Sequence, residues 1–137
     1  MILRMSFEEV TALNAATERL LSSPDGGGVA APPEVLAELE ARLPVRGDIS
    51  VLTLAQQRRL VAGLEVVLAH LKRRMDALIV ELYVGADDTV NAYFDYANVL
   101  TLKARLDEMG QEMVGLIELM TGSGPTEETA EQVTFLD

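Results

Sequence analysis

The chain has 137 residues, of which 49% are hydrophobic and 24% charged, so one domain with an aliphatic core is expected. Its net charge of −11 disfavours binding to nucleic acid or to anionic membrane surfaces, because both need clustered basic residues. The lack of cysteine excludes disulfides and thiolate chemistry, and charged residues interrupt every apolar stretch, so we expect a cytoplasmic protein that does not span a membrane.

The first third of the chain predicts a helix, a flexible loop and a second helix. Ser6 followed by Glu9 has the spacing of a capping box, which predicts a helix over residues 6–21. Residues 22–31 include three consecutive glycines, which is typical of a mobile loop. Two prolines then fit the first turn of a second helix over residues 34–43.

The longest predicted element is a helix over residues 54–84. Thr53 and Gln56 indicate its start, and Gly85 its end, because glycine enters the left-handed region cheaply. Apolar residues recur in it with a period of 3.5 and form a seam that needs a partner helix along its whole length. The seam consists of Val61, Leu64, Leu68, Leu71, Met75, Leu78 and Leu82.

A fourth helix is expected over residues 87–120, and the short turn before it forces it antiparallel to the third. The predicted fold class is therefore an all-α helical bundle, in which two shorter N-terminal helices lie against a long antiparallel hairpin. A single domain is expected over residues 1–121. Residues 122–137 are predicted to be an acidic, flexible C-terminal tail.

The distal half of the fourth helix predicts a homodimer. Counting outward from the turn places Leu78 near Tyr93 and Leu71 near Leu100. In that register the remaining apolar residues form a second stripe, which the third helix cannot also cover. Unless the N-terminal helices hide it, such a stripe indicates an interface between two copies of the chain. It comprises Leu102, Leu106, Met109, Met113, Leu116 and Met120.

Polar residues at the start of the fourth helix form a candidate ligand site. Asp88, Asn91 and Asp95 share one helix face beside Tyr96, and their oxygens suit a hard cation or a polar ligand. The alternative is that the carboxylates merely stabilise the positive end of the helix.

Two further clusters allow a structural or a recognition role. The aromatic residues near the turn are expected to close the end of the bundle, with partner recognition as the alternative. Basic residues 72–74, next to His70, are expected to be a solvated helix edge, with docking of an acidic partner as the alternative. The aromatic cluster is Tyr83, Tyr93, Phe94 and Tyr96.

The sequence shows no catalytic machinery, since its single histidine has no partner at metal-ligand spacing and no phosphate-binding glycine motif is present. We therefore expect no enzyme and no cofactor. The leading prediction is an adaptor or assembly protein that acts through helix–helix contacts. The alternative is a helical bundle that binds a small ligand or metal in a regulatory role.

Overall fold

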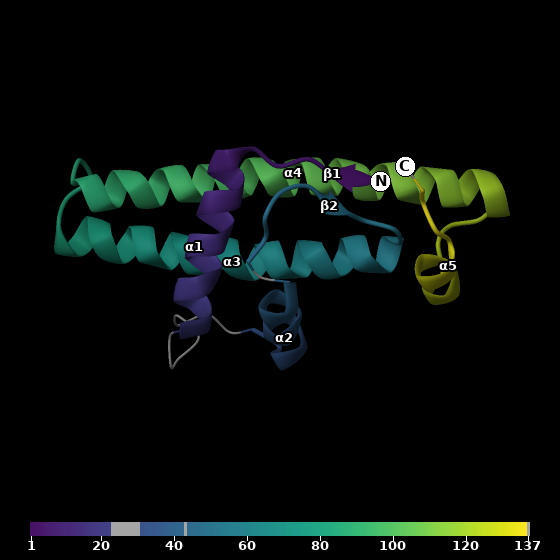
Figure 1. Cartoon of the computed structure of the whole chain (residues 1–137), viewed down its shortest axis with the longest axis horizontal. Helices are drawn as coiled ribbons and strands as arrows, with labels where there is room; N and C mark the ends of the chain where they lie inside the picture. The colour runs from purple at the N-terminus through teal and green to yellow at the C-terminus, as the bar shows by residue number, and fades with distance from the viewer. Residues whose placement is uncertain (23–30, 43, 137) are drawn as a thin grey trace.

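The computed structural model describes residues 1–22, 31–42 and 44–136 as a helical bundle with a small antiparallel sheet (Figure 1). The mobile loop predicted for residues 22–31 therefore lies largely outside the described residues. No helix in the described ranges is long and apolar enough to cross a membrane. The elements are β1 (Ile2–Leu3), α1 (Phe7–Ser22), α2 (Pro33–Arg42), β2 (Ile49–Ser50), α3 (Leu54–Glu81), α4 (Asp87–Thr121) and α5 (Glu127–Gln132).

Both predicted N-caps are formed. The Glu9 backbone N–H donates to Ser6 Oγ (3.1 Å), and Glu9 Oε1 accepts from the Ser6 N–H (2.8 Å). At the start of α3, the Gln56 N–H donates to Thr53 Oγ1 (3.1 Å), while the Gln56 side-chain oxygen accepts from the Leu52 N–H (2.8 Å). Local capping signals therefore located the beginnings of α1 and α3 correctly.

The end of α3 differs from the prediction. The helix stops at Glu81 rather than at residue 84, and the Ala86 N–H donates to the Tyr83 carbonyl (3.1 Å) within the turn. Gly85 is not left-handed; among the described residues only Gly122 has a positive φ, 73°, at the end of α4. The left-handed glycine stop therefore operates on α4, where the Gly122 N–H donates to the Glu118 carbonyl (2.8 Å).

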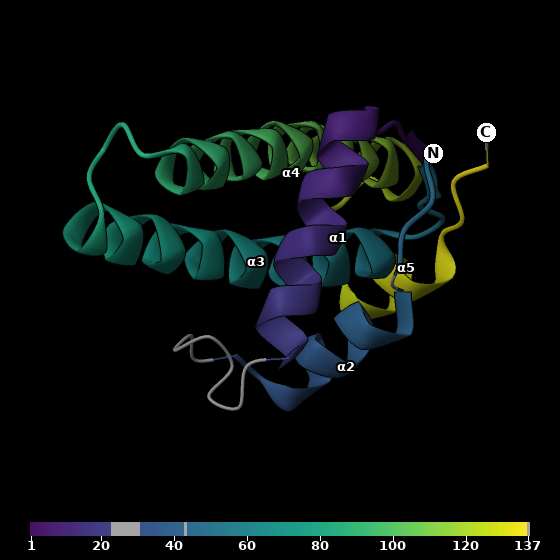
Figure 2. The same cartoon turned by 60° about the vertical axis from the view of Figure 1, so that its left-hand side comes forward.

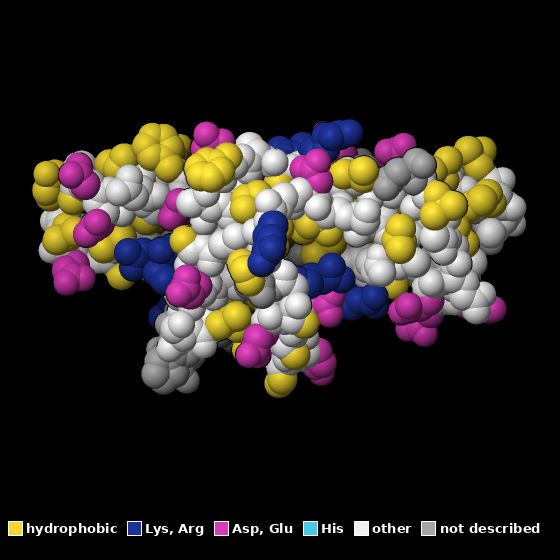
Figure 3. Space-filling model, in the orientation of Figure 1, with side chains coloured by type: hydrophobic (Ala, Val, Ile, Leu, Met, Phe, Trp, Pro, Cys, Tyr) yellow, Lys and Arg dark blue, Asp and Glu magenta, His cyan; other side chains and the backbone are white. Residues whose placement is uncertain are grey.

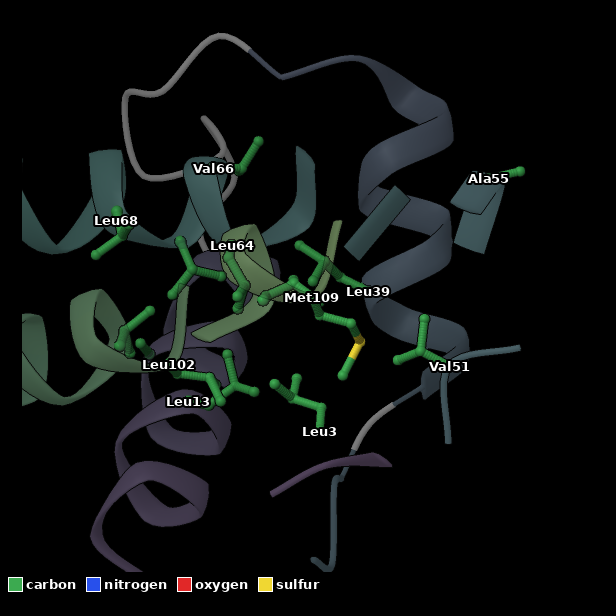
Figure 4. Packing of buried hydrophobic residues seen from close by; sticks show 14 of the residues in the cluster. Leu3, Leu13, Leu39, Val51, Ala55, Leu64, Val66, Leu68, Leu102 and Met109 are labelled. Atoms are coloured by element: carbon green, nitrogen blue, oxygen red, sulfur yellow. The ribbon is translucent and has the colours of Figure 1, made fainter. Parts of the chain in front are cut away.

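The short elements gather over one part of the hairpin. Helix α1 crosses both α3 and α4, whereas α2 and α5 lie against α3 (Figure 2). Strands β1 and β2 pair antiparallel, with Ile2 opposite Ser50 and Leu3 opposite Ile49. The core lies beneath these elements, and Figure 4 shows its side chains converging. Those it labels include Leu3, Leu13, Leu39, Val51, Leu64, Leu102 and Met109.

An ion pair fixes α1 to α4 at the edge of this core. Arg105 Nη2 donates to both carboxylate oxygens of Glu9, at 2.5 and 2.6 Å, and the Thr101 hydroxyl donates to the same carboxylate. Burial raises the pKa of the Glu9 carboxyl, but hydrogen bonds from Arg105 and Ser6 outweigh it and leave the pKa below its usual value. Glu9 therefore serves α1 both as a cap and as an anchor.

The C-terminal segment is docked, which corrects the prediction of a flexible tail. Helix α5 lies against α3, and Ala130 and Phe135 are buried. The Phe135 N–H donates to the Leu52 carbonyl (2.7 Å), and the Phe135 carbonyl accepts from the Met1 amino group (3.1 Å). The alternative that the sequence left open, docking of Phe135 and Leu136, is thus confirmed for Phe135, whereas Leu136 is exposed.

Candidate interaction surface at the hairpin tip

The apolar residues of α4 form one stripe rather than two. Ala92 and Val99 are buried and continue at helical spacing into the distal half of the helix, whereas Tyr93 and Leu100 are exposed. The predicted register is therefore wrong at these positions, since Ala92 and Val99, and not Tyr93 and Leu100, lie on the buried face of α4. Its reference point was a turn at Gly85, but α3 already ends at Glu81. With one stripe, α3 can face α4 over its whole length.

Most of the predicted dimer interface is consequently buried within a single chain. Elements α1, α3 and β1 pack against α4 there, so the prediction of an uncovered stripe is wrong for four of its six residues. Leu116 and Met120 remain partly exposed. The homodimer itself stays a prediction, but the four buried residues cannot make its contact. The four buried residues are Leu102, Leu106, Met109 and Met113.

The candidate ligand residues do not converge on a site. Asp88 and Asn91 are exposed, and Asp95 lies 3.6 Å from Arg19 of α1 in an ion pair. Tyr96 packs against the core. Over the described ranges, no three His, Asp or Glu side chains are grouped so that they could hold a metal ion. The shared helix face is therefore real, but its best-placed carboxylate pairs with a guanidinium of α1.

The hairpin extends beyond its cover at the α3–α4 turn, on the left in Figure 1. Leu71 of α3 is 0% exposed, whereas Leu82, the C-cap residue just past the end of α3 in the predicted seam, is 47% exposed. The reason is the placement of α1, which crosses the hairpin well before the turn (Figure 2). We call the exposed apolar residues around the turn the tip surface. They are Ile79, Val80, Leu82, Tyr83, Val84, Val90, Tyr93 and Phe94.

Three aromatic residues dominate the tip surface. Tyr83, Tyr93 and Phe94 are 65%, 59% and 57% exposed, so the prediction that they close the bundle is wrong for them. Only Tyr96 of that cluster packs against the core. The Tyr93 and Phe94 rings meet edge to face, with centroids 6.0 Å apart. The alternative that the sequence left open, partner recognition, stays a prediction.

The basic cluster lies between α1 and the tip surface. His70 is buried, and within the described part of the chain neither of its ring nitrogens has a hydrogen-bond partner. Burial lowers the pKa of His70, and the positive charges of Arg19 and Arg74 lower it further. A shallow depression begins beside this residue and runs toward the turn. It is lined by His70, Arg73, Arg74, Ala77, Leu78 and Glu81.

Comparison of the chain with family models, curated proteins and solved structures gives no match. A proposal about the function therefore rests on the surface of the molecule itself.

Proposed function

We propose that the protein is a non-enzymatic adaptor or assembly protein that works through helix–helix contacts, and that the tip surface makes the contact. The supporting observation is the group of exposed aromatic and aliphatic side chains at the uncovered end of the hairpin. Contiguous exposed apolar patches commonly mark interaction sites. Tyrosine and phenylalanine, with few rotatable bonds, supply large contact areas at low entropic cost.

The position of the patch supports this role. Away from the tip, the short helices and the sheet cover much of the apolar face of α3 and α4, although Leu119 and Met120 at the end of α4 are exposed. The tip has no such cover from the described elements, although its seam continues the same apolar pattern. The only histidine of the chain, His70, is a buried residue of α3 and does not belong to the tip surface. The cytoplasmic location remains a prediction from the sequence.

Site-specific photo-cross-linking tests the proposal. A photoreactive residue replaces Tyr93 in the full chain, and a matched probe replaces Phe7, which is 80% exposed on α1, outside the tip surface. In an extract of the cells that make the protein, the probe at residue 93 is expected to give a discrete protein adduct. Adding Tyr83→Glu should abolish that adduct without changing the melting temperature. Equal capture by both probes, or no adduct at residue 93, would refute the proposal.

A further inference from the structure

We infer that the face of α3 between Arg73 and Glu81, next to the tip surface, binds a second copy of the chain, with the two α3 helices crossing antiparallel at Ala77 and Leu78. This inference rests on the proposed function and names the partner. It commits to a two-fold contact, the commonest symmetry of soluble oligomers.

The order of charges along α3 makes this face complementary to itself. Arg73 and Arg74 lie at the end nearer α1, Ala77 and Leu78 lie in the middle, and Glu81 lies next to the turn. A two-fold axis through the middle reverses this order in the second copy. The basic end of each chain then meets the acidic end of the other.

The spacing matches one register. Arg74 and Glu81 are separated by about 10 Å along the helix, at 1.5 Å per residue. In an antiparallel pair centred between Ala77 and Leu78, Arg74 lies opposite Glu81 of the second copy, and the pair occurs twice. Ala77 is exposed and has only a methyl group at the crossing point, so the helix axes can approach closely.

The charged side chains that this register pairs are available to bind a second chain. Within the described part of the chain, no ion pair involves Arg73, Arg74 or Glu81. Arg74 lies instead close enough to His70 and Arg19 to lower the pKa of each through its positive charge. A carboxylate from a second chain would offset this crowding of cationic groups.

The apolar part of the contact surrounds the crossing point. In Figure 3, hydrophobic side chains cover the end of the hairpin, acidic side chains lie at its extremity, and basic side chains lie nearer α1. The charges thus flank an apolar centre, which is the arrangement of protein interfaces with a buried core and a polar rim.

Charge reversal tests the register. In a two-fold contact, Arg74→Glu places two carboxylates opposite each other at both ends, and Glu81→Arg places two cations there. Each variant alone should weaken self-association by about tenfold or more, because like charges facing each other are costly. Glu118→Arg makes the same charge change as Glu81→Arg on an exposed site at the other end of the hairpin, and should leave association unchanged.

Mixing the two variants gives the decisive result. Arg74→Glu and Glu81→Arg chains restore opposite charges at both ends of a heterodimer, as does one chain carrying both changes. Sedimentation velocity over a concentration series should therefore show a dimer in the equimolar mixture, with a wild-type melting temperature for each variant.

Two results would overturn the inference. One is a wild-type chain that stays monomeric at all concentrations; the other is a mixture that associates no better than the single variants. Neither result bears on the proposed function, which fails if the probe at residue 93 captures no partner or if both probes capture partners equally.

Discussion

The two ends of the α3–α4 hairpin carry the same apolar pattern but meet different surroundings. At the covered end, α1, α2, α5 and the small sheet bury the helices, and Leu64 and Leu71 lie in the core. At the tip, Leu82 continues the same seam and is nearly half exposed. A heptad pattern therefore indicates that a helix packs against a partner. It does not indicate whether that partner belongs to the same chain.

The largest difference in stability is expected between two variants that each change one residue, one at the covered end and one at the tip. Leu71→Asp places a carboxylate in the core and should cost several kcal/mol, enough to unfold a domain of ordinary stability. Leu82→Asp lies in the same seam and should leave the chain folded. Circular dichroism melts of the two variants decide this. Equal destabilisation would mean that the tip is as well packed as the covered end.

The next largest effect on stability is expected for the Glu9–Arg105 ion pair, because this pair lies at the covered end. Arg105→Met leaves the buried Glu9 carboxylate without its guanidinium and should cost about 2 kcal/mol. Arg58→Met, on an exposed part of α3, should change stability by less than about 0.5 kcal/mol. Urea denaturation of both variants measures the difference. Similar midpoints would show that the pair does not hold α1 in place.

Two glycines in α4 offer a matched pair of smaller effect. A Cβ at Gly110 would lie 2.4 Å from Gln57 Nε2, which is buried and donates to the Leu106 carbonyl (2.9 Å). Gly110→Ala should therefore destabilise the chain by about 1–2 kcal/mol, through the displaced hydrogen bond. At Gly115 a Cβ meets nothing within 4 Å, so Gly115→Ala should stabilise by about 0.5–1 kcal/mol. Opposite shifts in melting temperature are expected, and shifts of the same sign would contradict the packing described for Gly110.

The pH dependence of His70 probes the boundary between the two ends. Because its pKa in the folded chain lies below the ordinary 6.5, the folded state takes up this proton less readily than the unfolded state. The contribution of His70 to stability is thus complete above pH 6.5 and is lost as the pH falls through that value. A proton NMR titration of the single imidazole should give a midpoint below 6.5. A midpoint at or above 6.5 would mean that His70 is hydrated or paired with a carboxylate.

Local signals in the sequence predicted the helices well. Capping residues at Ser6 and Thr53 and helical spacing of apolar residues located α1, α3 and α4. The bundle class followed from them. Sequence periodicity could not predict the contacts between distant parts of the chain. Glu9 and Arg105 are separated by 96 positions, and the strands β1 and β2 are too short to show a pattern. The register of α4 failed for a related reason, since it depended on where α3 ends.

The candidate site was predicted only in part. The aromatic cluster was predicted from its position around the turn, but its exposure depends on how far α1 reaches along the hairpin. The sequence predicts the distal stripe as the interface because the predicted register turns it away from α3. Its cover by α1 and β1 comes from distant parts of the chain. Residue types thus indicated both surfaces, and only the tertiary arrangement distinguishes the buried one from the exposed one.

Amide hydrogen exchange of the wild-type chain at low and high concentration tests the central claim most directly. If the tip surface binds a second copy, protection over residues 74–94 should rise with concentration, while residues 101–121 of α4 exchange equally slowly at both. Protection that rises over residues 101–121 instead, or that nowhere depends on concentration, would contradict the assignment of this contact to the hairpin tip.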